Sequence, residues 1–208
     1  MALHKRKYKD YQHYLSHQRE KLSKKMEHFQ QKWNKRVESF RKRLADISPK
    51  IPGKKVLCLA ARLGEEVRAF RDLGHSEATG IDLNPGSDNE YVIEGDFHNI
   101  PFEDSTFDGV YCNCLDHAWD LRKVSMESAR VLKTGGILVL DVPFVQPYKK
   151  HDYKKNVKKR HKYESTLWDS LDDVIQEFHE FSEVHDRIPS NTHKIIVFMQ
   201  KKYTLEVK

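Results

Sequence analysis

Residues Lys54–Asp82 read KKVLCLAARLGEEVRAFRDLGHSEATGID, and this stretch decides the fold. It begins with Val56–Ala60, an uninterrupted apolar run of the kind that a strand buried on both faces requires. A turn of small residues leads into a helix that Gly74 ends, and Ala78–Leu83 forms a second strand carrying Asp82. Because a helix N-terminus suits an anionic group and a carboxylate suits ribose hydroxyls, the stretch predicts a nucleotide-binding β-α-β unit.

The composition is typical of a soluble protein with one domain of ordinary size and an appendage. The 208 residues are 38% hydrophobic and 33% charged. No apolar run approaches the ~20 residues that a membrane span needs. The basic N-terminus lacks the apolar segment of a secretory signal. The three cysteines, Cys58, Cys112 and Cys114, fall in or beside predicted strands, which favours reduced thiols and a cytoplasmic location.

Charge is divided unevenly along the chain. The overall net charge is +6, but residues 1–50 carry +10, residues 51–148 carry −7 and residues 149–208 carry +3. The middle of the chain is therefore acidic, and the basic charge lies in an N-terminal arm and one later segment. We accordingly expect two parts, a basic amphipathic helical arm at 1–50 and an α/β domain at 51–208.

The arm predicts a long amphipathic helix, because its apolar residues recur every three or four positions. One position of that apolar stripe is polar, Gln18, and Ser48-Pro49 ends the pattern. Three interpretations remain open. The helix packs on its own domain, or residues 8–47 pair with a second copy or a partner helix, or the arm contacts nucleic acid. The apolar positions are Tyr8, Tyr11, Leu15, Leu22, Met26, Phe29, Trp33, Val37, Phe40, Leu44 and Ile47.

Beyond the opening unit, strands and helices alternate. Further strands are predicted at 91–94, 107–113 and 137–142, and helices at 121–132 and 167–175. Strands at 177–185 and 193–200 are joined by a short link, which implies an antiparallel hairpin at the sheet edge. The whole pattern predicts a Rossmann-like α/β fold with a seven-stranded sheet.

A basic segment, YKKHDYKKNVKKRHKY at 148–163, lies in a loop that we place at 146–165. It follows the fifth strand and has two interpretations. It is a loop that recognises an acidic substrate, or a solvated run of charge without such a role.

Four sequence landmarks carry a resemblance to a known family. They read VLCLAARLG at 56–64, GIDLNP at 80–85, EGDFHNIPFEDSTFDGVY at 94–111 and ARVLKTGGILVLDVP at 129–143. In this order the chain resembles the class I S-adenosylmethionine-dependent methyltransferases, of the small-molecule type similar to methyltransferase type 11, over roughly residues 54–200. The resemblance implies S-adenosylmethionine as cofactor.

The resemblance also implies which residues contact the cofactor. Asp82 matches the acid that accepts hydrogen bonds from both ribose hydroxyls, Leu83 lies against the adenine, and Asp96 accepts from the adenine amino group. In the first loop the family pattern is acid-x-Gly-x-Gly-x-Gly, and here Cys58, Ala60 and Arg62 depart from it. The full set implied is Ala60, Ala61, Arg62, Gly64, Asp82, Leu83, Asp96, Phe97 and Asn113.

Candidate catalytic groups follow the fourth strand. His117 is the first candidate for a general base, since its ordinary pKa lies near neutrality, and Asp116 is the second. The alternative for His117 is a loop histidine that bonds backbone. No metal site is expected, because the three cysteines lack zinc-motif spacing and suit a buried core.

These observations lead to one function and two alternatives. The leading hypothesis is a methyltransferase that acts on an oxygen or nitrogen atom of a small or glycan-type acceptor. One alternative is an RNA or other nucleic-acid methyltransferase that uses the basic arm and loop. The other is a methyltransferase-like scaffold that has lost catalysis, for which the altered loop is the argument.

Overall fold

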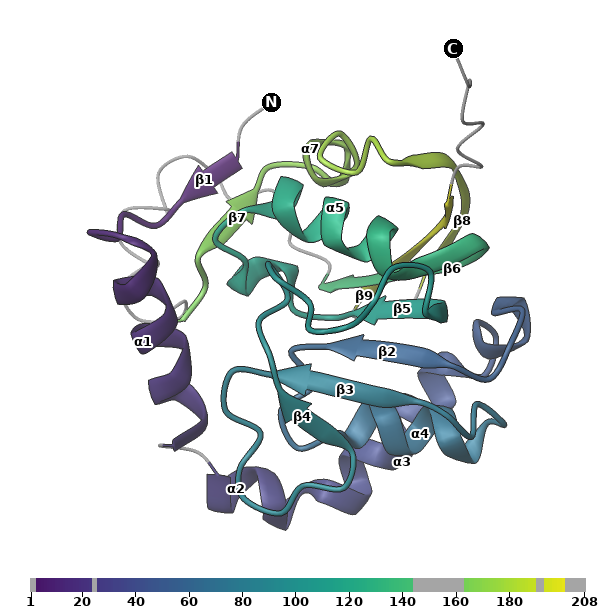
Figure 1. Ribbon diagram of the computed structural model, residues 1–208, viewed down its shortest axis with the longest axis horizontal. Coiled ribbons are helices and arrows are strands. Elements are labelled where there is room, and N and C mark those ends of the chain that lie inside the picture. Colours follow the sequence, from purple (N-terminus) through teal and green to yellow (C-terminus); the bar gives the residue numbers. More distant parts are fainter. Residues whose placement is uncertain (1–2, 24–25, 144–162, 190–192, 201–208) are drawn as a thin grey trace.

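The computed structural model describes residues 3–23, 26–143, 163–189 and 193–200. A central sheet has the order β4-β3-β2-β5-β6-β9-β8, with parallel pairing from β4 to β6 and antiparallel pairing of β9 with both neighbours (Figure 1). The strands are β2 (Val56–Leu59), β3 (Thr79–Asp82), β4 (Val92–Glu94), β5 (Phe107–Cys112), β6 (Leu132–Pro143), β8 (Phe181–Pro189) and β9 (His193–Gln200). The predicted Rossmann-like sheet with an antiparallel last hairpin is confirmed.

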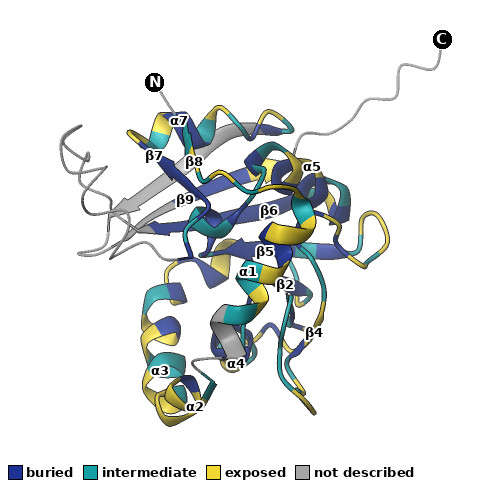
Figure 2. Cartoon of the chain, turned by 90° about the vertical axis from the view of Figure 1, so that its left-hand side faces the viewer, coloured by how far each residue is buried: buried dark blue, intermediate teal, exposed yellow. Residues whose placement is uncertain are grey.

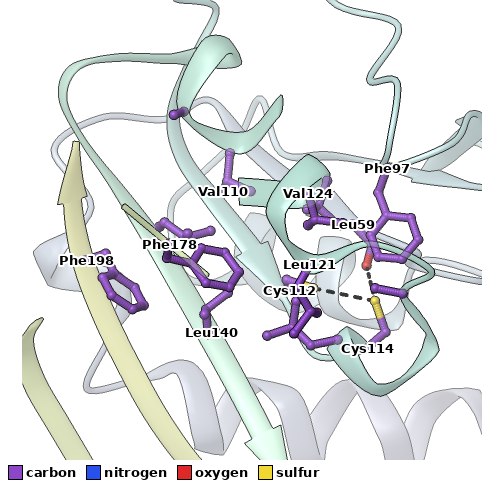
Figure 3. Packing of buried hydrophobic residues seen from close by; sticks show 14 of the residues in the cluster. Leu59, Phe97, Val110, Cys112, Cys114, Leu121, Val124, Leu140, Phe178 and Phe198 are labelled. Atoms are coloured by element: carbon purple, nitrogen blue, oxygen red, sulfur yellow. Dashed lines mark hydrogen bonds between the residues drawn. The ribbon is translucent and has the colours of Figure 1, made fainter. Parts of the chain in front are cut away.

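Helices cover both faces of this sheet. On one face lie α3 (Trp33–Leu44) and α4 (Glu65–Asp72), and on the other lie α5 (Leu121–Val131) and α7 (Leu171–Ile175) (Figure 2). Alternate residues of β2 serve the two layers, because successive side chains of a strand point to opposite faces. Leu57 and Leu59 pack in the α5 layer shown in Figure 3, whereas Val56 and Cys58 pack toward α3 and α4.

The N-terminal segment is not one long helix. It forms a short strand β1 (Leu3–Lys5), then α1 (Tyr11–Ser23), α2 (Met26–Gln31) and α3, with a 3-10 turn η1 (Ser48–Lys50) after them. The division follows from what each helix buries. Phe40 and Leu44 of α3 join the core beneath the sheet, while Tyr14 and Leu15 of α1 are buried at the ends of the strands. One straight helix cannot follow both surfaces, and the apolar stripe is largely used inside the chain's own fold.

The segment after residue 163 also differs from expectation at its start. The predicted helix at 167–175 begins only at Leu171, because Thr166–Trp168 forms a strand, β7, that pairs antiparallel with β1. Ser170 caps α7 through its side chain and Asp173 bonds back in a capping box, which fixes the helix start. The basic segment 148–163 lies, apart from its last residue, outside the described residues. Among the described helices, none has both the length and the apolar composition that crossing a membrane requires.

Candidate active site

The C-terminal ends of the parallel strands converge under α1 (Figure 1). Between them is a cavity that encloses about 590 Å³, counted out to the open solvent at its mouth. Its lining comes from the first two helices, from the loops after β2, β3 and β4, and from the segment after β5. The lining residues are Tyr14, Gln18, Phe29, Ala60, Arg62, Asp82, Leu83, Gly95, Phe97, Cys114 and His117.

The loop after β2 keeps a left-handed backbone at two positions that are not glycine. Ala60 has φ of +48° and Arg62 has φ of +51°, a conformation that ordinarily favours glycine. The backbone N–H of Arg62 donates to Asp82 Oδ2 at 2.9 Å, and the N–H of Ala61 donates to the Ile81 carbonyl at 2.9 Å. These bonds tie the loop to the neighbouring strand. A sharp turn is therefore retained with alanine and arginine in place of glycine.

Gly64 has a different part in this loop. It is the residue before α4, with φ of +97°, and a Cβ atom at its position would lie 2.4 Å from Cβ of Tyr91. Glycine is required there by both the backbone and the space. Neither Gly64 nor the buried Ala61 is among the residues that line the cavity. Both support the loop from behind, and their predicted cofactor contacts stay predictions.

Asp82 stands at the centre of the cavity wall. Besides the bond from Arg62, its Oδ1 accepts the backbone N–H of Asn84 at 2.9 Å. Each carboxylate oxygen has capacity for a second hydrogen bond, so the group remains able to accept from a pair of vicinal hydroxyls. Leu83, the next residue, adds an apolar surface and receives a bond at its carbonyl from Arg19 of α1, at 3.3 Å.

Asp96 fastens α1 to the loop after β4. The Tyr11 hydroxyl donates to Asp96 Oδ2, and the His98 backbone N–H donates to Oδ1 at 2.9 Å. Burial opposes ionisation of Asp96, but the hydrogen bonds from His98 and Tyr11 outweigh it and lower the pKa of this carboxyl. Its neighbours Gly95 and Phe97 line the cavity, whereas Asp96 is not among the lining residues. Its predicted contact with an adenine amino group stays a prediction.

Residues of α1 and α2 complete the cavity, and sequence reasoning did not predict them as site residues. Tyr14 is fully buried, and its hydroxyl has no hydrogen-bond partner among the described residues. Gln18 donates from Nε2 to the Tyr163 carbonyl at 2.7 Å and to Ser165 Oγ at 3.0 Å. The polar interruption of the apolar stripe at Gln18 was the signal for this contact. Phe29 of α2 adds an apolar wall.

The candidate bases follow β5, in a short 3-10 turn η2 (Leu115–His117). His117 lines the cavity, and its Nδ1 lies 3.0 Å from the Tyr163 carbonyl. A carbonyl only accepts, so Nδ1 carries the proton and the neutral ring has its lone pair on Nε2. Asp116 Oδ1 lies 4.0 Å from that Nε2, and Asp116 is not among the lining residues.

Asn113 lies beside this cavity but belongs to a second one. Its Nδ2 donates to Glu66 Oε1 at 3.4 Å, and its buried Oδ1 has no partner among the described residues. It lines a polar cavity under α3 and is not among the residues that line the first. Arg62 lines both. Arg62 is thus the residue that the two linings share.

The cysteines are all buried and serve two different layers. Cys58 packs in the layer of α3 and α4, while Cys112 and Cys114 pack in the α5 layer. The Cys112 and Cys114 sulfurs lie 3.6 Å apart, and Cys114 Sγ donates to the Leu59 carbonyl at 3.4 Å (Figure 3). Burial raises the pKa of the Cys58 thiol, and the hydrogen bond with Cys112, together with burial, raises the pKa of the Cys114 thiol, so both stay protonated.

This sheet order and the cavity at the carboxyl ends of its strands define a Rossmann-like nucleotide-binding fold with a methyltransferase topology. Residues 57–140 match the family described as "Methyltransferase domain", in agreement with the resemblance to the class I methyltransferases seen in the sequence. A solved structure with this fold is an S-adenosylmethionine-dependent methyltransferase of Thermotoga maritima, described as a possible histamine N-methyltransferase. Its TM-score is 0.64 and its identity 16%, over 90% of this chain and 100% of that one.

Curated relatives match the same region. Demethylmenaquinone methyltransferase of Thermotoga maritima is 34% identical over 112 residues, which are 49% of this chain and 48% of the relative. The 24-methylenesterol C-methyltransferase 2 of Oryza sativa subsp. japonica is 33% identical over 112 residues, which are 47% of this chain and 31% of the relative. The chain therefore spans less than half the length of these relatives.

The cavity fits the cofactor that this domain implies, S-adenosylmethionine. Asp82 supplies acceptors for a ribose, and Leu83 and Phe97 supply apolar surfaces for a purine. The unpartnered hydroxyl of Tyr14 supplies a hydrogen-bonding group that a ligand can satisfy. An apolar cavity with a few converging polar groups is what a nucleoside requires.

Proposed function

We propose that the protein is an S-adenosylmethionine-dependent methyltransferase that acts on an oxygen or nitrogen atom of a small or glycan-type acceptor. The observation that carries this proposal is the Asp82 carboxylate at the end of β3, held by the β2 loop at the wall of an apolar cavity. The names of the relatives support a small-molecule acceptor, since one names demethylmenaquinone and the other 24-methylenesterol. S-adenosylmethionine, when bound, supplies an electrophilic methyl group.

The chain's residues would then divide the work of binding. Asp82 accepts hydrogen bonds from the ribose, and Leu83 and Phe97 pack against the adenine. Ala60 allows the backbone to approach the ligand closely, because its methyl is the smallest side chain after glycine. Arg62 offers a charge-assisted donor where the usual glycine offers only backbone. Methyl transfer needs alignment of two reactants above all, so these contacts are the main contribution of the protein.

His117 is the proposed base for an acceptor whose proton must leave. Its Nδ1 proton is directed to the Tyr163 carbonyl, which leaves the lone pair of the neutral ring on Nε2. Asp116, 4.0 Å from Nε2, would stabilise the ring once it is protonated. His117→Gln is expected to lower kcat with little change in cofactor affinity. Loss of cofactor affinity instead would make His117 a binding residue.

Calorimetric titration with S-adenosylmethionine and with S-adenosylhomocysteine is the test of the proposal. We expect binding to the wild-type protein and loss of most of it in Asp82→Ala. Asp72→Ala is the matched control, because Asp72 pairs with Arg68 on the outer surface of α4, away from the cavity. Absence of binding at millimolar ligand would support the scaffold alternative. Unchanged affinity in Asp82→Ala would refute the ribose assignment.

A methyl-transfer assay then separates the acceptor classes. Incubation with labelled cofactor and a panel of hydroxyl, amine and carbon acceptors should label the first two groups. Labelling of RNA, with a steep dependence on salt, would instead support the nucleic-acid alternative. Two arginines of α3 already form ion pairs inside the chain, Arg36 with Glu65 and Arg43 with Asp141. These pairs reduce the positive charge that the N-terminal arm presents to RNA.

A further inference from the structure

A second cavity lies under α3, on the other side of the β2 loop. We call it the arginine cavity, and it encloses about 520 Å³ counted to its open mouth. None of its lining side chains is acidic in the part of the chain that the structure describes. The lining residues are Arg36, Ser39, Phe40, Arg43, Arg62 and Asn113. Side chains that only fill a core are apolar. Three guanidinium groups around one cavity therefore indicate a role other than core packing.

Two of the arginines are fixed in place from behind. Arg36 Nε lies 2.5 Å from Glu65 Oε1, and Arg43 Nε lies 2.8 Å from Asp141 Oδ2. Both carboxylates are fully buried. The two guanidinium groups also lie over the Phe40 ring, with 5.6 Å from Arg36 Cζ and 4.7 Å from Arg43 Cζ to its centre. A guanidinium has five N–H donors, so the ion pair through Nε does not use all the donors of Arg36.

Arg62 is the third cation, and its position links the two cavities. Its guanidinium lies over the Phe29 ring at 5.0 Å and makes no ion pair with any described carboxylate. Asn113, which also lines the arginine cavity, follows β5 directly. A molecule in the arginine cavity and a molecule in the cofactor cavity would therefore both lie next to Arg62.

The charges around the arginine cavity sum to an excess of positive charge. Facing the three arginines are the buried carboxylates of Glu65 and Asp141, each paired with one of them. Glu66 is a further acid beside the cavity, and its Oε1 accepts a hydrogen bond from Asn113. Burial, with the neighbouring Glu65 carboxylate, raises the pKa of Glu66 to about 8, so that it is largely neutral at pH 7. Of the three arginines, Arg62 is the one that forms no ion pair with a carboxylate of the described residues.

We propose that the arginine cavity binds an acidic group of the methyl acceptor, a carboxylate or a phosphate. This assignment rests on the proposed methyltransferase function and defines its substrate class. Guanidinium groups suit both anions, because they form paired, charge-assisted hydrogen bonds. The carboxylate in the methionine part of the cofactor is a second anionic group that suits the arginine cavity. The experiment must therefore distinguish the acceptor from the cofactor.

The experiment uses inorganic phosphate as probe and the thermal unfolding midpoint as readout, with and without saturating S-adenosylhomocysteine. Phosphate should raise the midpoint of the wild-type protein in both conditions. Ser39→Asp places a negative charge in the cavity and should weaken the apparent phosphate affinity at least tenfold. Asn34→Asp adds the same charge at an exposed position of α3 that does not line the cavity, and should leave the phosphate effect intact.

A second pair of changes removes a cation without stranding its buried partner. Arg36→Gln combined with Glu65→Gln replaces the ion pair by two neutral amides and should also weaken phosphate binding. Equal phosphate effects in wild type and Ser39→Asp, or none in wild type, would overturn the assignment. A phosphate effect that S-adenosylhomocysteine abolishes would assign the arginines to the cofactor carboxylate. Failure of S-adenosylhomocysteine itself to bind would refute the proposed function, while the phosphate arm still tests the cavity.

Discussion

Two residues of the β2 loop, Ala60 and Arg62, have a strained backbone conformation that hydrogen bonds of the loop hold in place. Ala60 and Arg62 both hold positive φ, which costs a residue other than glycine about 1–3 kcal/mol. The hydrogen bonds from Ala61 and Arg62 to the end of β3 keep the loop in this shape. Loss of the family's glycines has therefore changed which side chains enter the site without removing the turn itself.

Substitution of Ala60 by glycine should relieve this strain. We expect Ala60→Gly to raise the free energy of unfolding by about 0.5–1 kcal/mol, since glycine adopts positive φ without steric cost. Ala61→Gly is the matched control, because Ala61 is buried in the same loop without a positive φ, and it should destabilise. Denaturant titration measures both changes. A loss of stability in Ala60→Gly equal to that in Ala61→Gly would contradict the strain argument.

Glu66 gives the protein a predictable dependence on pH. Burial and the Glu65 carboxylate raise its pKa to about 8, against the opposing effect of Arg62. In the unfolded chain the pKa returns to about 4.3, so between these values the folded state binds the proton that the unfolded state has lost. The contribution of Glu66 to stability is thus full below about pH 4 and is lost as pH rises toward 8.

Replacement of Glu66 by glutamine should remove that slope. Unfolding free energies of Glu66→Gln and wild type, measured from pH 5 to pH 8, should diverge, with the wild type losing stability relative to the variant as pH rises. Glu38→Gln serves as control, because Glu38 is on the exposed side of α3 and hydrogen bonds from Arg41 lower its pKa. Parallel curves for wild type and Glu66→Gln would show that Glu66 titrates normally in the folded state.

At the scale of elements, α3 is attached to the sheet by a buried ion pair. Arg43 meets Asp141, which lies fully buried in β6 and also accepts from the Tyr111 hydroxyl of β5 at 2.5 Å. Breaking such a pair from one side leaves a charge without compensation, at a cost of about 3–5 kcal/mol. This network thereby fixes α3, which contributes most of the lining of the arginine cavity, to β5 and β6.

Arg43→Gln should therefore destabilise the protein by about 3–5 kcal/mol in denaturant titration. Adding Asp141→Asn should restore a large part of that loss, because the buried charge is then removed. Arg41→Gln, which affects only an exposed pair with Glu38, should cost less than about 1 kcal/mol. Additive losses in the Arg43–Asp141 double variant would mean that the two residues do not act as a pair.

Elements whose signal lies in local sequence were predictable, and those fixed by distant contacts were not. The apolar runs of β2 and β3 gave the central sheet, and the order of landmarks gave Asp82, Leu83 and Phe97 as neighbours in space. The division of the N-terminal helix was missed, because periodicity shows an apolar face but not the surfaces against which it turns. Strand β7 was read as helix, since its pairing partner is β1, at the opposite end of the chain.

The candidate site was predictable to the same extent. The strand-end residues follow from topology, because carboxyl ends of parallel strands meet at one edge. Tyr14, Gln18 and Phe29 reach the cavity through the docking of α1 and α2, for which the only local signal was the polar residue Gln18 in the apolar stripe. The three arginines of the second cavity come from a helix and a loop, and only their packing brings them together.

At the scale of the whole molecule, α1 closes the cofactor cavity, and ligand binding should therefore stabilise it. When S-adenosylmethionine is present at 100 times its Kd, the free energy of any opening that releases the ligand rises by about 2.7 kcal/mol. Amide hydrogen exchange in α1 should then slow by up to about 100-fold, while α5, which lines neither cavity, serves as the internal reference. Equal protection of α1 and α5, or none in α1, would contradict a covering role for α1.

The contact between the N-terminal segment and the segment that begins at residue 163 has a consequence for how the protein is made. Tyr8 bonds Ser165 at 2.9 Å across 157 residues, and β1 pairs with β7. During synthesis on the ribosome the N-terminal segment emerges first, yet its partners emerge after the parallel strands. The wall formed by α1 is consequently assembled late, and a nascent chain that ends before residue 163 should bind the cofactor poorly even with Asp82 in place.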